Sequence, residues 1–169
     1  MKTIHLIRHA KSSWDNPSLA DIDRPLNARG IRACQIMAPH INAAGSVFNN
    51  VYCSPAVRAQ STIERIKKHL PDVELRWKTD QRLYSFSESD LIKWCRELED
   101  SVSDVTLIGH NPALTDFCNA LSGSEIENIP TCGYVQLAAT REGHWQDIAA
   151  TLFELKVFLT PKTIKNLEG

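Results

Sequence analysis

The chain has 169 residues, of which 43% are hydrophobic, and 19 basic against 20 acidic residues give a formal net charge of −1. We expect one domain, residues 1–169, with a hydrophobic core. The balanced charge argues against a nucleic-acid binder and a disordered chain, and no apolar run reaches the roughly 18 residues of a membrane helix. We expect the N-terminal residues to lead into a strand and not to form a signal peptide. We therefore expect a cytoplasmic monomer without nucleic-acid or membrane partners.

The first strand is predicted at Thr3–Arg8, which is short and rich in branched residues. After an irregular stretch, a helix is predicted from Asn27, with apolar residues at helical spacing up to Ile41. Pro39 should kink or shorten this helix. A second strand is predicted at Val51–Cys53.

Ser54-Pro55 then reads as the N-cap and first position of a helix that runs to about Leu70. Val73–Trp77 is a candidate third strand. Ser87 with Asp90 resembles a capping box before another helix with apolar residues up to Leu98.

A buried strand is predicted at Val105–Ile108, and the turn that follows it leads into a helix through Leu121. The remaining strands are expected at Tyr134–Ala139 and Leu152–Leu159, with Thr160-Pro161 ending the last one. Strands that alternate with helices indicate an α/β fold around a mostly parallel sheet.

The five cysteines are an odd number and include no C-x-x-C pair. This spacing argues against zinc and redox motifs and makes a disulfide framework improbable. We expect five free thiols that pack as small hydrophobic side chains in a reducing cytoplasm.

Several basic side chains follow the ends of predicted strands. Arg8 and His9 end the first strand, Arg58 lies in the first turn after the second, and His110 follows the Val105–Ile108 strand. Ligands of open α/β sheets bind at the carboxyl ends of strands, so these four side chains are expected to converge. Two arginines, two histidines and helix N-termini predict a site for a compact dianion such as phosphate.

Histidine adds nucleophilic chemistry to such a site. A neutral imidazole held beside arginines can attack phosphorus and become phosphorylated itself. The second histidine would bind a phosphoryl oxygen or shuttle a proton. This reaction needs no cofactor and no metal, and the sequence has no carboxylate cluster of the metal-binding kind.

These motifs resemble the histidine phosphatase (phosphoglycerate-mutase-like) superfamily. The segments that carry the resemblance, in the family's order, are LIRHAKS at 6–12, RPLN at 24–27 with Arg29-Gly30, SPAVRA at 54–59 with Thr62, and GHNP at 109–112. The small size and the Arg-Pro-Leu segment are most similar to SixA-type phosphohistidine phosphatases.

The resemblance implies a role for each matching residue. His9 would be the nucleophile, and Arg8, Arg58 and His110 would complete the catalytic phosphate pocket. Arg24 matches an arginine of the SixA-like group, and it and Ser12 are further candidates for phosphate binding. The implied fold is a three-layer α/β/α sandwich with a mixed, mainly parallel sheet.

The sequence departs from the family pattern at three places. Ala10 replaces the usual glycine after the nucleophile. Asp15 stands where larger members have an asparagine, with Asn16 next to it. The segment after the third strand, which carries the general acid in many members, has no carboxylate before Glu88 and Asp90. Whether any of these four polar residues assists proton transfer is left open at this point.

An alkoxide leaving group needs a proton from a positioned acid, whereas a protonated phosphohistidine leaves as neutral imidazole. The missing acid therefore favours hydrolysis of phosphohistidine on a protein. The alternatives are a small-molecule phosphomonoester or phosphoramidate phosphatase of the same superfamily and a phospho-binding module without turnover. A cysteine phosphatase fits poorly, because Cys53 and Arg58 have only four residues between them and none is glycine.

Overall fold

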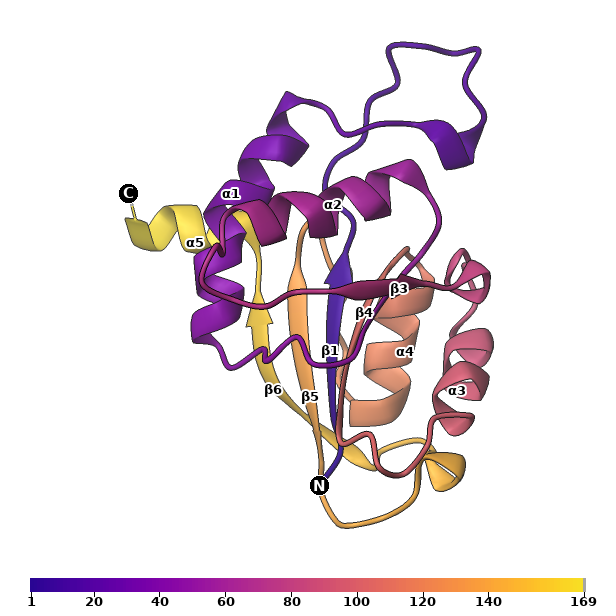
Figure 1. The fold of residues 1–169 in the computed structure, drawn as a ribbon. Helices are drawn as coiled ribbons and strands as arrows, with labels where there is room; N and C mark the ends of the chain where they lie inside the picture. Colours follow the sequence, from indigo (N-terminus) through magenta and orange to yellow (C-terminus); the bar gives the residue numbers. More distant parts are fainter. Residues whose placement is uncertain (169) are drawn as a thin grey trace.

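The computed structural model describes residues 1–168 and shows a six-stranded sheet with helices on both faces (Figure 1). The strands lie in the order β3-β2-β4-β1-β5-β6. The first four strands in this order, β3, β2, β4 and β1, run parallel to one another, and β5 is antiparallel to both β1 and β6. The strands are β1 Thr3–Arg8, β2 Val51–Cys53, β3 Trp77–Thr79, β4 Asp104–Gly109, β5 Tyr134–Ala139 and β6 Phe153–Leu159, and the α-helices are α1 Ala28–Ala43, α2 Val57–Lys68, α3 Glu88–Arg96, α4 Ala113–Ser122 and α5 Pro161–Glu168.

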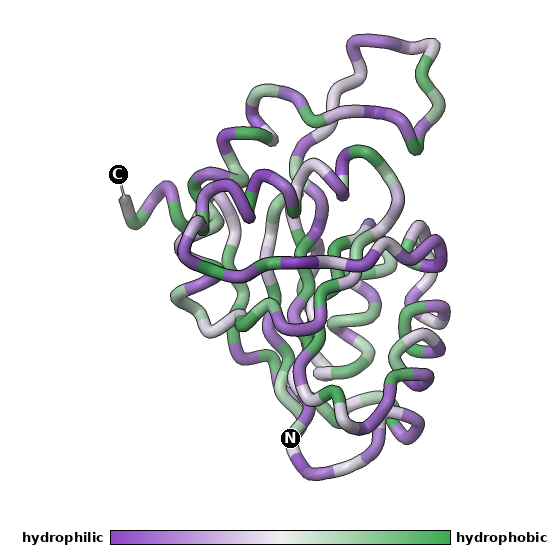
Figure 2. Tube along the Cα trace, viewed as in Figure 1, coloured by the Kyte–Doolittle hydropathy of each residue, from purple (hydrophilic) through white to green (hydrophobic). Residues whose placement is uncertain are grey.

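Two hydrophobic cores explain the three layers. Helices α1, α2 and α5 pack on one face of the sheet, and α3 and α4 pack on the other (Figure 1). Within β1, Ile4 and Leu6 belong to the core under α3 and α4, while Ile7 belongs to the opposite core. Figure 2 shows the resulting hydropathy, with hydrophobic residues recurring along the central strands. The predicted three-layer sandwich with a mixed, mainly parallel sheet is confirmed.

The predicted strands β1, β2 and β5 match the structure residue for residue, and β4 is one residue longer at each end. The third strand was predicted too early: β3 is Trp77–Thr79 and not Val73–Trp77. The pairing with β2 explains why β3 begins at Trp77. Strand β2 has only three residues, and its first residue, Val51, lies opposite Trp77. Leu75 is buried in the core without being part of a strand.

Helix α2 begins at Val57 and not at Pro55, so the predicted cap at Ser54 is wrong. The Ser54 hydroxyl instead accepts a hydrogen bond from the Ala56 amide and lies 2.7 Å from the Nε2 atom of His110. A serine before a helix is a strong signal for an N-cap. Here the Ser54 hydroxyl oxygen instead contacts His110, which lies far away in the sequence. The helix ends at Lys68, within two residues of the predicted end.

One further local prediction, the capping box at Ser87 and Asp90, fails. Ser87 occupies the N-cap position of α3, but its side chain bonds Ser89 and makes no capping bond, and the Asp90 carboxylate accepts from Ser85. The helix ends at Arg96, so Leu98 lies beyond it. Helix α1 continues through Pro39 to Ala43 and is not shortened there.

The helix α5 was not predicted, although the chain carries a start signal for it. The Thr160 hydroxyl accepts a hydrogen bond from the Thr163 amide at 3.1 Å, and Pro161 is the first helical residue. The buried Ile164 anchors α5 to the core that also contains α1 and α2. Thr160-Pro161, which was predicted to end the last strand, therefore also marks the start of α5.

Buried polar and sulfur groups follow ordinary packing rules. His5, fully buried in β1, bonds the hydroxyl of Tyr134 at 2.6 Å and the carboxylate of Asp104 at 2.8 Å. All five cysteines are buried free thiols, as predicted. Within residues 1–168, no helix combines the length and the apolar character needed to cross a membrane.

Gly30 fixes the distance between α1 and the segment that follows β1. A Cβ atom at this position would lie 2.2 Å from the carbonyl oxygen of Lys11. That atom belongs to the backbone, so neither partner can move by changing a rotamer. The first turn of α1 therefore approaches residues 10–12 as closely as a backbone allows.

We predict that Gly30→Ala destabilises the fold by about 1–3 kcal/mol, the usual cost of overpacking a tight contact. Urea denaturation measures this change. Gly143→Ala is the matched control, because nothing lies within 4 Å of a Cβ atom there. Equal stability of the two variants would contradict the close approach at Gly30.

Candidate active site

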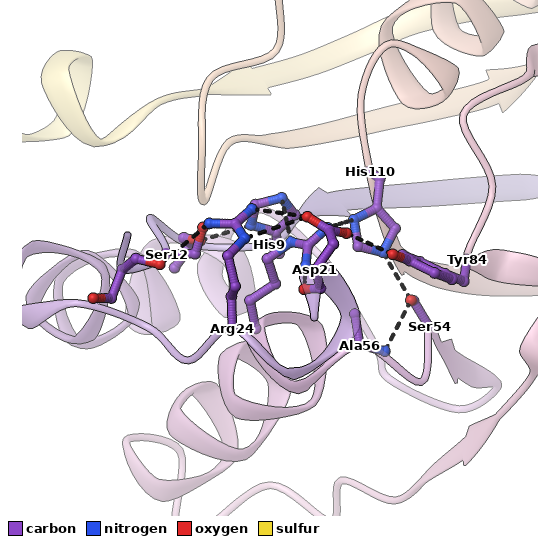
Figure 3. A network of polar contacts seen from close by, with 11 residues as sticks. His9, Ser12, Asp21, Arg24, Ser54, Ala56, Tyr84 and His110 are labelled. Atoms are coloured by element: carbon purple, nitrogen blue, oxygen red, sulfur yellow. Dashed lines mark hydrogen bonds and ion pairs between the residues drawn. The ribbon is translucent and has the colours of Figure 1, made fainter. Parts of the chain in front are cut away.

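The carboxyl ends of three neighbouring strands place the predicted side chains at one edge of the sheet. Arg8 is the last residue of β1, and His9 follows it. His110 follows β4, which lies between β1 and β2. Arg58 lies in the first turn of α2, the helix that follows β2. The expected convergence at this edge is observed, and Figure 3 shows His9 and His110 approaching each other there.

A pocket of about 310 Å³ opens at this edge. Its cationic lining residues are Arg8, Lys11, Arg24 and Arg58, and its carboxylate is Asp21. All six side chains that the sequence singled out line it: Arg8, His9, Ser12, Arg24, Arg58 and His110. The pocket is therefore strongly cationic in a chain whose net charge is −1.

The His9 ring is fixed by the carbonyl of the next residue. The Ala10 carbonyl can only accept, so the His9 Nδ1 atom, 2.7 Å away, carries the proton. The Nε2 atom is then the unprotonated nitrogen and accepts from the Nε atom of Arg58 at 3.4 Å. Burial, with smaller effects of the nearby arginines, lowers the pKa of His9 to about 4. At neutral pH the ring is neutral and its Nε2 lone pair is unprotonated.

The His110 ring is held in the opposite tautomer. A guanidinium only donates, so the His110 Nδ1 atom accepts from the Nη2 atom of Arg58 at 3.4 Å. In the neutral ring the proton is then on Nε2, which donates to the Ser54 hydroxyl at 2.7 Å. Burial, followed by the neighbouring His9 and Arg58, lowers the pKa of His110 to about 3.

Arg24 and Arg8 complete the cationic lining. The Nη1 atom of Arg24 donates to the Ser12 hydroxyl at 2.6 Å, and its guanidinium stacks 3.6 Å from the ring centroid of Trp14. Arg8 donates to the carbonyl of Ile129 at 3.0 Å. Burial and the charge of Arg58 lower the pKa of Arg8 below its ordinary value. Ser12 thus orients an arginine of the pocket.

No sequence pattern predicted Asp21, the carboxylate of the pocket. Its Oδ2 atom accepts from the Arg58 Nη2 atom at 2.9 Å and from the Tyr84 hydroxyl at 2.5 Å. The Tyr84 hydrogen bond is the largest cause that lowers the pKa of Asp21, to about 2, and Arg58 and Arg24 add to it. Asp21 is therefore ionised at neutral pH and carries no proton to donate.

The four polar residues considered for proton transfer do not line the pocket. Asp15 and Asn16 lie on the exposed segment between β1 and α1, and Glu88 and Asp90 lie in the first turn of α3.

Cys53 is fully buried, and burial raises the pKa of its thiol. A buried, protonated thiol is a poor nucleophile, which agrees with the sequence-based argument against a cysteine phosphatase. Among the described side chains, residues 1–167, no three of His, Cys, Asp or Glu are grouped closely enough to hold a metal ion.

Comparison with known proteins adds a family to this geometry. The family model for the histidine phosphatase superfamily (branch 1) matches residues 4–95. The chain belongs to this superfamily. An uncharacterized protein of Mycobacterium tuberculosis is 30% identical over a match of 166 residues. The match covers 92% of this histidine phosphatase and 100% of the relative.

Solved structures share the fold of this histidine phosphatase. A putative phosphohistidine phosphatase SixA from Nakamurella multipartitia superposes with a TM-score of 0.79 at 22% identity, covering 95% of this chain and 96% of that one. A mycobacterial glucosyl-3-phosphoglycerate phosphatase superposes with a TM-score of 0.69 at 14% identity, covering 93% and 98%. At these identities the structures establish a common fold.

The low pKa values of the two histidines predict acid lability. An unfolded histidine titrates near 6.5, so between pH 6.5 and 4 the unfolded chain binds protons that the folded chain does not. The free energy of unfolding therefore falls as the pH is lowered through this window, by at most about 1.4 kcal/mol per pH unit for each histidine.

We expect urea denaturation between pH 7 and 4.5 to show this slope in the wild type and a shallower slope in His9→Asn. His69→Asn is the matched control, because the His69 side chain does not line the pocket. A His9→Asn variant with the wild-type slope would contradict the low pKa of His9.

Proposed function

We propose that this histidine phosphatase hydrolyses phosphohistidine on a protein through phosphorylation of its own His9. The observation that carries the proposal is the neutral His9 ring, whose Nδ1 proton is held by Ala10 while Nε2 lies beside the Arg58 guanidinium. We assign the whole chain, residues 1–169, to one catalytic domain.

In the first step of the proposed reaction, the Nε2 lone pair of His9 attacks phosphorus. A nitrogen–phosphorus bond to His9 forms, the bond to the substrate imidazole breaks, and the protonated substrate ring leaves as a neutral imidazole. The phosphorylated His9 ring is positively charged, and the hydrogen bond from Nδ1 to the Ala10 carbonyl stabilises it. Water then attacks phosphorus and releases phosphate and neutral His9.

The arginines of the pocket supply electrostatic stabilisation in this scheme. Arg8, Arg24 and Arg58 would hold the phosphoryl oxygens, while His110, in a ring that Ser54 orients, would position the Arg58 guanidinium through its unprotonated Nδ1 atom. The buried Nε donor of Arg8 has no hydrogen-bond partner among the described residues, whereas Arg24 and Arg58 would exchange hydrogen bonds to Asp21 for bonds to the phosphoryl oxygens. No step of the scheme requires a metal ion.

The state of Asp21 supports a phosphohistidine substrate over an alkyl phosphate. An alkoxide leaving group needs a proton donor, and the Asp21 carboxylate is held ionised by Tyr84 and Arg58. A protonated imidazole leaves without that help. Two aromatic side chains near the pocket, Trp14 at 75% exposure and Phe86 at 49%, suit contact with a protein surface.

Small phosphorylated molecules are the second candidate substrates. The mycobacterial structure with this fold is named as a glucosyl-3-phosphoglycerate phosphatase, which acts on a small phosphate ester. A pocket of about 310 Å³ also accommodates a small molecule. A module that binds phosphate without turnover is the third candidate, and a covalent intermediate distinguishes it from either enzyme.

We predict that a phosphohistidine protein labelled with ³²P transfers its label transiently to His9. Rapid acid-free quenching and peptide mapping should find a bond that is labile in acid and stable in base. His9→Ala should abolish labelling and lower the rate at least about 10³-fold. His144→Ala, at an exposed position, is the matched control and should label like the wild type. Wild-type phosphate release by His9→Ala would refute the nucleophile, and activity that a chelator abolishes and a divalent metal restores would refute the metal-free scheme.

A comparison of leaving groups tests the missing proton donor. We predict that kcat/KM for phosphohistidine exceeds that for an alkyl phosphate by at least about 10²-fold, the usual contribution of an absent general acid. Because Asp21 is ionised, Asp21→Asn should leave this ratio unchanged even if both rates shift. Equal rates on the two substrates, or a selective loss of alkyl phosphate hydrolysis in Asp21→Asn, would contradict the argument.

A further inference from the structure

A second cleft opens next to the phosphate pocket. It has a volume of about 390 Å³, and its charged lining consists only of cations: Lys11, Arg29, Arg32, Lys162 and Lys165. We call these five side chains the basic groove. Lys11 and Thr131 line both the basic groove and the phosphate pocket, so the two clefts adjoin.

Two helices that are remote in sequence build the basic groove. Arg29 and Arg32 lie three residues apart on α1, and Lys162 and Lys165 have the same spacing on α5, so each pair lies on one side of its helix. The two helices pack against each other and lie side by side in Figure 1. All four side chains are exposed.

The cations of the basic groove are not neutralised within the protein. Among the side chains that the structure describes, residues 1–167, no carboxylate forms an ion pair with any of the five. Elsewhere on the surface, Arg76, Arg82 and Lys156 each pair with a nearby carboxylate. Helix α1 contains no acidic residue in its 16 positions. An uncompensated positive field thus lies over this side of a chain that is nearly neutral overall.

This arrangement opposes the stability of both helices. Arg29 and Lys162 lie in first turns, where the helix dipole favours acidic side chains, and neither first turn contains one. Like charges three residues apart on a helix also repel each other. An anionic partner in the basic groove would relieve both effects.

We propose that the basic groove binds an acidic segment of the protein substrate, beside the phosphohistidine that enters the phosphate pocket; this inference rests on the proposed function. A segment that enters both clefts would pass Lys11 and Thr131, which they share. A nucleic acid fits less well, because no aromatic side chain lines the groove for base stacking. The groove contributes to substrate selection and association, while the chemistry takes place at His9.

Matched phosphohistidine peptides test the proposal, one flanked by glutamates and the other by glutamines. The variant is Arg29→Glu/Arg32→Glu with Lys162→Glu/Lys165→Glu, which leaves Lys11 and the phosphate pocket intact. Wild-type kcat/KM should favour the glutamate peptide by at least about tenfold at low salt and lose this preference at high salt. The variant should prefer a lysine-flanked peptide while hydrolysing p-nitrophenyl phosphate within about twofold of the wild-type rate.

The control is a variant with exposed lysines reversed elsewhere, Lys68→Glu/Lys78→Glu, which should keep the wild-type preference. Because the four-site variant risks misfolding, Arg29→Gln/Arg32→Gln serves as a milder form and should weaken the preference in the same direction. Equal use of the two peptides by the wild type would overturn the proposal, as would a variant that loses p-nitrophenyl phosphate hydrolysis to the same extent as peptide hydrolysis.

Binding of unphosphorylated peptides separates this proposal from the proposed function. Fluorescence anisotropy should detect the glutamate peptide on the wild type, and binding should be lost in the four-site variant, whether or not phosphohistidine is hydrolysed. Tighter binding of tripolyphosphate or of a single-stranded oligonucleotide than of the glutamate peptide would overturn an acidic protein segment as the ligand. Hydrolysis of aryl phosphates without hydrolysis of any phosphohistidine peptide would refute the proposed function alone.

Discussion

The guanidinium of Arg58 is the group on which the site depends. It is 3% exposed and contacts the nitrogens of both pocket histidines at 3.4 Å. A buried cation is costly unless it has partners, and Asp21 provides a carboxylate at 2.9 Å and a backbone carbonyl at 2.6 Å. The same cation disfavours protonation of both imidazoles, in addition to the effect of burial. Arg58 therefore adds to burial in keeping His9 neutral, and it also orients His110.

Asp21 balances this cation without neutralising the pocket. One carboxylate lies among Arg8, Lys11, Arg24 and Arg58, so a positive surplus remains for a phosphoryl dianion. The Tyr84 hydroxyl donates to Asp21 as well, which disperses the negative charge that would otherwise repel a phosphate. The ionisation of Asp21 is thus a consequence of its role as a partner for buried cations, and the same ionisation removes it as a proton donor.

The parts of the fold that could be predicted from sequence are those that local periodicity determines. Both faces of β1 are buried, so a short segment rich in branched residues marked it, and the strand ends then placed Arg8, His9 and His110. Ser54 and Asp21 act on partners more than 35 residues away, and no local pattern encodes such contacts. The strand β3 was misplaced for the same reason, because its register depends on β2.

Charge shows most clearly why residue counts say little about a site. A total of 19 basic and 20 acidic residues argues against extended polyanions, and that argument still holds for the surface as a whole. At physiological ionic strength, however, charges act over about 8 Å, so a ligand responds to the side chains near it and not to the sum. Helix α1 concentrates cations beside the phosphate pocket because its acidic counterparts lie on other elements. A nearly neutral protein can therefore present both a pocket for one phosphoryl group and an adjoining positive groove.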